Sequence, residues 1–125
     1  QLPKIKNRSG NITVVENFKT IPFKIERIYY LYDVPGGESR GGHGHKELEQ
    51  FVLAASGCFD ITIDDGLNRK IVRLDRPDIA LNIKPGIWRD INGFSSGAIC
   101  LVLASHPYSE NGYISDFESF KSLVV

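Results

Sequence analysis

Residues 59–64 read Phe-Asp-Ile-Thr-Ile-Asp, and this short stretch decides the fold class. Apolar and polar side chains alternate along it, and successive side chains of a β-strand point to opposite faces of a sheet. The pattern therefore predicts a strand with one buried face. It ends at Asp64-Asp65-Gly66, where glycine accepts the positive φ that a tight hairpin turn requires.

Further apolar stretches on both sides of this hairpin are bounded by turn-forming residues. We expect strands within residues 12–15, 23–34, 48–55, 70–74, 79–83 and 98–105. Turn signals at intervals of about ten residues are typical of an all-β sandwich or barrel. A capping box at Ser115 and Glu118, followed by Phe120 and Val124 on one helical face, predicts a short C-terminal helix.

Length and charge limit the classes of function. The chain has 125 residues, which suits one domain, and we expect residues 1–11 to be a loosely ordered N-terminal segment. Fifteen basic residues balance fifteen acidic residues, whereas nucleic-acid-binding surfaces usually need a basic excess. The longest apolar run, residues 98–104, is too short to span a bilayer. We therefore expect neither a nucleic-acid nor a membrane partner.

Cysteine usage favours a cytoplasmic location. Cys58 and Cys100 are the two cysteines, and each lies within an apolar run. This is typical of reduced, structural thiols in a cytoplasmic protein, because disulfides form mainly in secreted proteins.

Residues 36–45 read Gly-Gly-Glu-Ser-Arg-Gly-Gly-His-Gly-His and contain two of the three histidines. On a strand, His43 and His45 would point to the same side. Such a pair suits metal binding, and it equally suits acid–base chemistry near neutral pH. The alternative is two unrelated surface histidines, which the surrounding glycines and Arg40 make less favourable.

The metal hypothesis can be tested against the metal-binding motifs of cupin barrels. Gly37, His43, His45 and Gly57 fit the first motif, but Gln50 occupies the position of the carboxylate ligand. The segment that would supply the last histidine, residues 84–90, contains none and instead carries Arg89, whose guanidinium stays positively charged. We therefore predict a cupin pocket without a metal, although Asp90 or Glu49 could complete a weaker site.

Arginines and aromatic residues cluster in the segments that would line the same barrel: Arg27, Tyr29, Arg40, Trp88 and Arg89. Guanidinium groups bind phosphate oxygens through paired N–H donors, and aromatic faces stack on rings. Each residue alone is explained equally well by surface exposure or core packing. Together with the histidines, they predict a pocket for a phosphorylated small molecule that contains a ring.

An ordered set of motifs extends over roughly residues 8–121 and comprises residues 21–30, 40–46, 49–50, 85–88, 94–95 and 103–105, with Tyr108 and Tyr113. In these motifs the chain resembles a known family, the dTDP-sugar 3,4-ketoisomerases. The chain departs from the family where Asn7-Arg8-Ser9-Gly10 replaces the usual Asp-x-Arg-Gly and where Gly44 replaces alanine. The first departure affects the N-terminal contacts, and the second is small.

The resemblance implies a homodimer of cupin (jelly-roll) subunits with no metal and no redox cofactor. The implied substrate is dTDP-4-keto-6-deoxy-D-glucose, whose ketone moves from C4 to C3 through an enediolate, in the biosynthesis of unusual deoxy sugars such as those of lipopolysaccharide O-antigens. It further implies His43 as carbon base, His45 as its proton-relay partner and Tyr29 as a donor to a sugar oxygen. Arg40 would bind the diphosphate or the enediolate, and Arg27, Gln50, Trp88 and Arg89 would line the pocket.

Three other kinds of cupin remain as alternatives. A 3,5-epimerase-type cupin would need a base on each face of the sugar ring, whereas neighbouring histidines suit proton transfer between adjacent carbons. A non-catalytic sugar-binding cupin would have no turnover, so His43→Asn would not change its activity. A metal-dependent cupin is the third possibility, and metal analysis distinguishes it.

We predict that the purified protein carries no stoichiometric transition metal, because Gln50 occupies the carboxylate position of the first cupin motif and residues 84–90 contain no histidine. Elemental analysis by plasma mass spectrometry checks this, with apo bovine serum albumin carried through the same purification as a blank. About one bound metal per chain that EDTA removes together with activity would contradict the prediction.

Overall fold

The computed structural model describes residues 1–35, 37–38, 40–45, 47–107 and 113–114, with the backbone alone for 40–45 and 113–114. These residues form strands and loops, and none of them is helical. The strands are β1 (Lys4–Ile5), β2 (Ile12–Thr13), β3 (Arg27–Leu31), β4 (Arg40–His45), β5 (Gln50–Ser56), β6 (Phe59–Asp64), β7 (Arg69–Leu74), β8 (Ala80–Ile83), β9 (Trp88–Asn92), β10 (Ile99–Ala104) and β11 (Tyr113–Ile114). The all-β expectation is confirmed, and the expected C-terminal helix lies outside the described residues.

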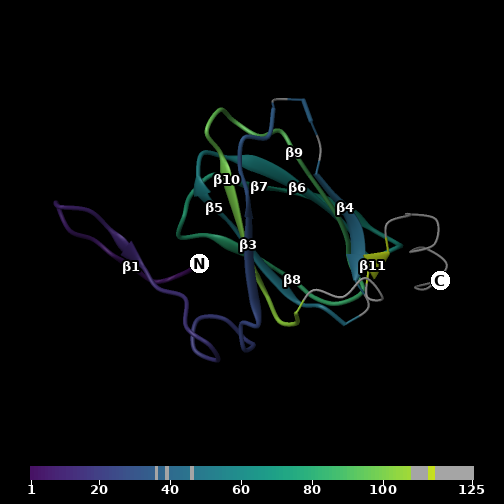
Figure 1. The fold of residues 1–125 in the computed structure, drawn as a ribbon, viewed down its shortest axis with the longest axis horizontal. Coiled ribbons are helices and arrows are strands. Elements are labelled where there is room, and N and C mark those ends of the chain that lie inside the picture. The colour runs from purple at the N-terminus through teal and green to yellow at the C-terminus, as the bar shows by residue number, and fades with distance from the viewer. Residues whose placement is uncertain (36, 39, 46, 108–112, 115–125) are drawn as a thin grey trace.

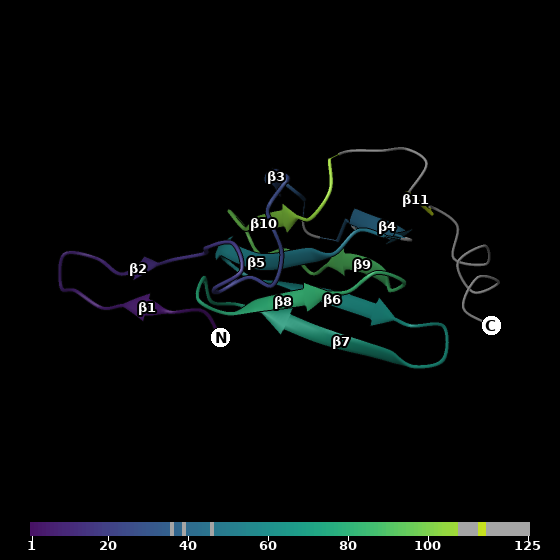
Figure 2. The ribbon, with the colours of Figure 1, turned by 90° about the horizontal axis from the view of Figure 1, so that it is seen from below.

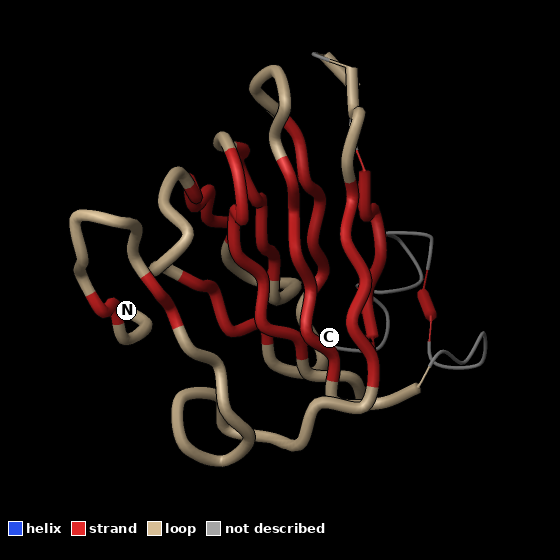
Figure 3. Tube along the Cα trace, turned by 60° about the vertical axis from the view of Figure 1, so that its left-hand side comes forward, coloured by secondary structure: helices blue, strands red, loops and turns tan. Residues whose placement is uncertain are grey.

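Two antiparallel sheets face each other (Figure 1). One has four strands in the order β3-β10-β5-β8, and the other has five in the order β11-β4-β9-β6-β7. The loops gather at the two ends of the strands, as Figure 3 shows. Strands β4 and β9 were not singled out from the sequence, because glycines fill one and charged residues interrupt the other.

The space between the two sheets is filled by apolar side chains. This interior cluster includes Val52, Phe59, Ile61 and Val102. The ring centroids of Phe59 and Phe94 lie 5.5 Å apart. The alternation that predicted β6 is explained here, because Phe59 and Ile61 point into the interior and are fully buried. The Asp64–Gly66 turn is also confirmed: Gly66 has φ 96° and its N–H donates to Asp64 Oδ1 at 2.7 Å.

A second apolar cluster covers the outer face of the four-stranded sheet. Leu2, Ile21 and Phe23 from the N-terminal segment pack there with Phe51 and Leu103. Strand β5 is therefore buried on both faces, which explains why its sequence is a continuous apolar run instead of an alternating one.

The N-terminal residues form a separate two-stranded sheet, β1-β2, that projects from the rest of the fold (Figure 2). Leu2 is buried, and its N–H donates to the Asp78 carbonyl oxygen at 2.7 Å. This contact attaches the start of the segment to the main sheets. How loosely residues 1–11 are held stays a prediction.

Both cysteines are free thiols, and they differ in environment. Burial raises the pKa of Cys100 to about 12, so this thiol stays protonated and unreactive at neutral pH. Cys58 is partly exposed, and its Sγ accepts a hydrogen bond from Arg73 at 2.9 Å. No helix in the described part of the chain has the length and hydrophobicity needed to cross a bilayer.

We predict that Phe59→Ala lowers the free energy of unfolding by about 3–5 kcal/mol, because it leaves a cavity at a fully buried position between the sheets. Urea unfolding followed by fluorescence measures this. Leu67→Ala is the control, since Leu67 is 80% exposed and should change the free energy by less than about 0.5 kcal/mol. Equal losses in the two variants would contradict the assignment of the core.

Candidate active site

Three polar side chains from three strands meet between the two sheets. Gln50 at the start of β5 donates from Nε2 to the Tyr29 Oη on β3 at 3.0 Å. Arg89 on β9 donates from Nη1 to Gln50 Oε1, and from Nη2 to the backbone carbonyl of Ile87 at 3.0 Å. The sequence analysis predicted all three residues for the site, and the structure brings them into contact.

These side chains point inward because of their positions in the strand alternation. Gln50 shares a face of β5 with Val52, and Arg89 shares a face of β9 with Ile91. Val52 and Ile91 both belong to the interior cluster, against which Tyr29 also packs. The interior is therefore apolar along most of its length, and its lining becomes polar at the level of Gln50 and Arg89.

Burial makes this hydrogen-bonded chain energetically important. Gln50 is 2% exposed and Arg89 is 3% exposed. A buried charge is tolerated only when hydrogen bonds replace the water it has lost. Because β5 and β9 belong to different sheets, the Arg89–Gln50 contact also joins the two layers.

Arg27 adds a second positive charge near Tyr29. Its guanidinium carbon lies 5.1 Å from the centroid of the Tyr29 ring, within the range of a cation–π interaction. Arg27 and Tyr29 are both half-buried on the inward side of β3. Arg27 thus contacts the Tyr29 ring, and Arg89 is linked to the Tyr29 hydroxyl through Gln50. Two guanidinium groups in one site suit an anionic ligand.

Trp88 lies on the opposite face of β9 from Arg89. Its indole Nε1 donates to Asp90 Oδ2 at 3.0 Å, and residues two apart on a strand share a face. The structure thus does not bring Trp88 together with Tyr29, Gln50 and Arg89. Its role in lining the pocket stays a prediction.

Asp90, one of the two positions suggested for a weaker metal site, accepts the Trp88 indole hydrogen bond. At the position of the missing carboxylate ligand, Gln50 accepts a hydrogen bond from Arg89, whose positive charge opposes a cation. A contribution of Glu49, the other suggested position, stays a prediction. Among the side chains that the structure describes, no group of three or more His, Cys, Asp or Glu residues could hold a metal ion.

The histidines are located by the backbone of β4. His43 pairs with Arg89 on β9, Arg40 pairs with Ile91, and the register shifts between these two pairs. His45 pairs with Tyr113 on β11. The side chains of Arg40, His43 and His45 lie outside the described part of the structure. The backbone register therefore brings the histidine segment beside Arg89, across 46 residues of sequence.

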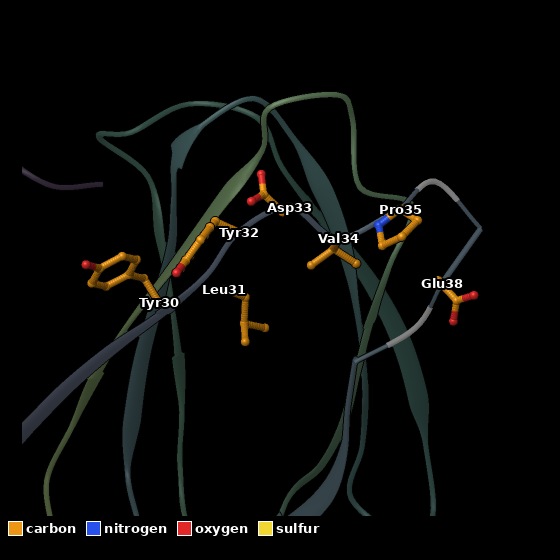
Figure 4. A pocket seen from close by; sticks show the side chains of 7 residues that line it. All are labelled: Tyr30, Leu31, Tyr32, Asp33, Val34, Pro35 and Glu38. Carbon is orange, nitrogen blue, oxygen red and sulfur yellow. The ribbon is translucent and has the colours of Figure 1, made fainter.

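A cavity of about 490 Å³ lies elsewhere, at the far end of β3 (Figure 4). The described residues that line it are Tyr30, Leu31, Tyr32, Asp33, Val34, Pro35 and Glu38. Two carboxylates and no cationic side chain are among them, so this lining does not favour a phosphorylated ligand.

A family model described as "FdtA: WxcM-like, C-terminal" matches residues 1–125, the whole chain. The chain belongs to this family. A curated relative from Aneurinibacillus thermoaerophilus, named TDP-4-oxo-6-deoxy-alpha-D-glucose-3,4-oxoisomerase, is 38% identical over 98% of this chain and 88% of its own length. The expected family resemblance is confirmed.

Solved structures support the same placement. A 3,4-ketoisomerase from Helicobacter canadensis is 44% identical, has a TM-score of 0.96, and is matched over 98% of this chain and 92% of its own. A histidine-to-asparagine variant of the 3,4-ketoisomerase QdtA from Thermoanaerobacterium thermosaccharolyticum is 32% identical, with a TM-score of 0.96 over 98% of this chain and 89% of its own. It was solved in complex with TDP-4-keto-6-deoxyglucose. The fold is therefore that of the cupin ketoisomerases.

Sequence reasoning found the members of this site but not their connections. Tyr29 and Gln50 are 21 residues apart and Gln50 and Arg89 are 39 apart, and no local pattern links them. It also missed the Ile87 carbonyl, which accepts from Arg89. Every residue has a backbone carbonyl, so the residue type at position 87 does not indicate that its carbonyl accepts this hydrogen bond.

We predict that Arg89→Lys lowers the free energy of unfolding by about 1–3 kcal/mol, because a lysine ammonium cannot reproduce the fork that reaches both Gln50 and Ile87. Denaturant unfolding monitored by circular dichroism gives the value. Arg8→Lys, at an exposed position, is the matched control and should be neutral. A neutral Arg89→Lys variant would show that the buried contacts do not hold the sheets together.

Proposed function

We propose that this protein is a sugar 3,4-ketoisomerase that converts dTDP-4-keto-6-deoxy-D-glucose to the 3-keto isomer. The observation that carries this proposal is the 38% identity, over 98% of the chain, to a relative named for that reaction. The solved variant that holds TDP-4-keto-6-deoxyglucose supports binding of the same class of sugar. The Tyr29–Gln50–Arg89 chain of hydrogen bonds supplies polar groups at the level where such a sugar would sit.

The reaction requires proton transfers alone. A base removes the acidic proton at C3, the C3–H electron pair forms the C3=C4 double bond, and the C4 carbonyl pair moves onto its oxygen. The C4 oxygen gains a proton, the C3 hydroxyl loses its proton, and the C3=C4 electron pair takes up a proton at C4. Two protons leave and two return, so the ketone ends at C3 with atoms and electrons balanced. An imidazole titrates near neutral pH and can both take and return such a proton.

The residues divide into proton carriers and binding groups. His43 is the proposed carbon base, His45 is its relay partner, and Tyr29 donates to a sugar oxygen. Their support is the register that pairs His43 with Arg89 and the contact chain that joins Arg89 to Tyr29. Arg27, Arg40, Gln50, Trp88 and Arg89 are the proposed binding residues, of which the guanidinium groups suit the diphosphate and the enediolate.

The proposal includes the assembly and the finer architecture. We infer a single jelly-roll barrel domain in a cytoplasmic homodimer. An exposed apolar row on the outer side of β3 supports dimerisation: Ile28 is 57% exposed, Tyr30 58% and Tyr32 61%. Such rows on monomers mark interaction surfaces. A second copy of the chain would bury this row. The rings of Tyr30 and Tyr32, whose centroids lie 5.8 Å apart, provide an aromatic anchor.

We predict that incubation with dTDP-4-keto-6-deoxyglucose in deuterated water gives a 3-keto product with deuterium at C4, observed by NMR. His43→Asn should lower kcat by about 10²–10⁴-fold, the usual contribution of a general base. His106→Asn, which changes an exposed histidine outside the proposed site, is the matched control and should retain activity.

Other outcomes separate the alternatives. Deuterium at C3 and C5 with the ketone retained at C4 would identify a 3,5-epimerase. Binding of the dTDP-sugar without deuterium uptake or 3-keto product would identify a sugar-binding protein, and either result rejects the isomerase.

A further inference from the structure

We propose that Gln50 is a positioning residue: it holds the hydroxyl oxygen of Tyr29 as a hydrogen-bond acceptor, so that Tyr29 directs its own proton at the substrate. This role rests on the proposed ketoisomerase function. Gln50 occupies the position at which metal-binding cupins carry a carboxylate ligand. In this protein its amide acts through Tyr29 and not through a metal.

The chemistry of Arg89 determines which way the Gln50 amide points. A guanidinium has five N–H donors and no acceptor, so the Gln50 atom that contacts Arg89 must be the oxygen. The other end of the amide, which contacts Tyr29 at 3.0 Å, is therefore the NH₂ group, and an amide NH₂ only donates. The Arg89 charge thus sets the direction of both hydrogen bonds.

The direction of the second bond constrains Tyr29. Its Oη accepts the Gln50 hydrogen, so the single phenolic proton cannot point toward Gln50 and is donated to another acceptor. In the proposed reaction that acceptor is a sugar oxygen, where charge develops as the enediolate forms. The Gln50 and Arg89 side chains are nearly completely buried, so water does not compete for these bonds.

The hydrogen bonds of this chain all run in the same direction. Arg89 donates to Gln50, Gln50 donates to Tyr29, and Tyr29 donates to the substrate, so every donor hydrogen points toward the substrate. The guanidinium carbon of Arg27, 5.1 Å from the Tyr29 ring centroid, adds a second positive group beside Tyr29. A chain of this polarity stabilises developing negative charge.

Glutamate at position 50 would reverse the effect on Tyr29 with almost no change in shape. A carboxylate only accepts hydrogen bonds, so it would still pair with Arg89 but would take the proton of Tyr29. Gln50→Glu therefore keeps the packing and the Arg89 contact while withdrawing the Tyr29 proton from the substrate. A purely structural Gln50 would tolerate this exchange.

The test measures steady-state kinetics of the full-length protein with dTDP-4-keto-6-deoxyglucose. We expect Gln50→Glu to lower kcat about 100-fold, the size of effect seen when one donor to a developing oxyanion is lost. KM and the calorimetric Kd for TDP should stay within about threefold, and the melting temperature should not fall. Asn11→Asp introduces the same chemical change at an exposed site and should leave all four values unchanged.

A double-mutant cycle with Tyr29→Phe assigns the effect to Tyr29. Because the amide acts through the phenol, Gln50→Glu should cost less than about threefold in the Tyr29→Phe background. Gln50→Met, which removes the donor without adding charge, enters the same cycle if the glutamate variant fails to fold. Full additivity in the cycle, or wild-type kcat in a folded Gln50→Glu variant, would overturn the role of Gln50. A wild-type protein without turnover would instead overturn the proposed function.

Discussion

The buried guanidinium of Arg89 is the constraint on which the polar end of the interior depends. A charge that is 3% exposed must have its lost hydration replaced by protein acceptors. Gln50 supplies one acceptor from the facing sheet and the Ile87 carbonyl supplies another from the adjoining loop. The same contact fixes the amide of Gln50 and, through it, the hydroxyl of Tyr29, so a single buried cation orders side chains from three strands.

Apolar packing provides the rigid support for this arrangement. The interior cluster around Phe59 and Val102 holds the two sheets at a set separation, and the second cluster seals the outer face of β5 and β10 beneath the N-terminal segment. Gln50 is therefore positioned by a strand that is packed on both sides. Polar groups held this way lose little mobility when a ligand binds, and preorganised donors of this kind are effective in catalysis.

Several elements of this picture could be predicted from local sequence. The alternation in residues 59–64 and the Asp-Asp-Gly turn identified β6 and its hairpin, and the motifs around His43 and Trp88 identified the family that the comparisons confirm. Other features could not be predicted locally. Strand β4 is rich in glycine, so its pairing with β9 has no periodic signal. Trp88 and Arg89 are neighbours in sequence, yet the alternation of β9 sends them to opposite faces.

The sequence by itself determined the all-β class, the identity of the polar residues and the replacement of a cupin carboxylate by Gln50, because these depend on residue type and short-range spacing. Only the tertiary structure decided that Arg89 reaches Gln50 across the two sheets and that Gln50 reaches Tyr29. These contacts join residues that are far apart in the chain, and strand pairing is what brings them together. The direction of the hydrogen bonds depends on the sequence and on the tertiary structure together. The sequence supplies a guanidinium, which can only donate, and the tertiary structure buries it against an amide.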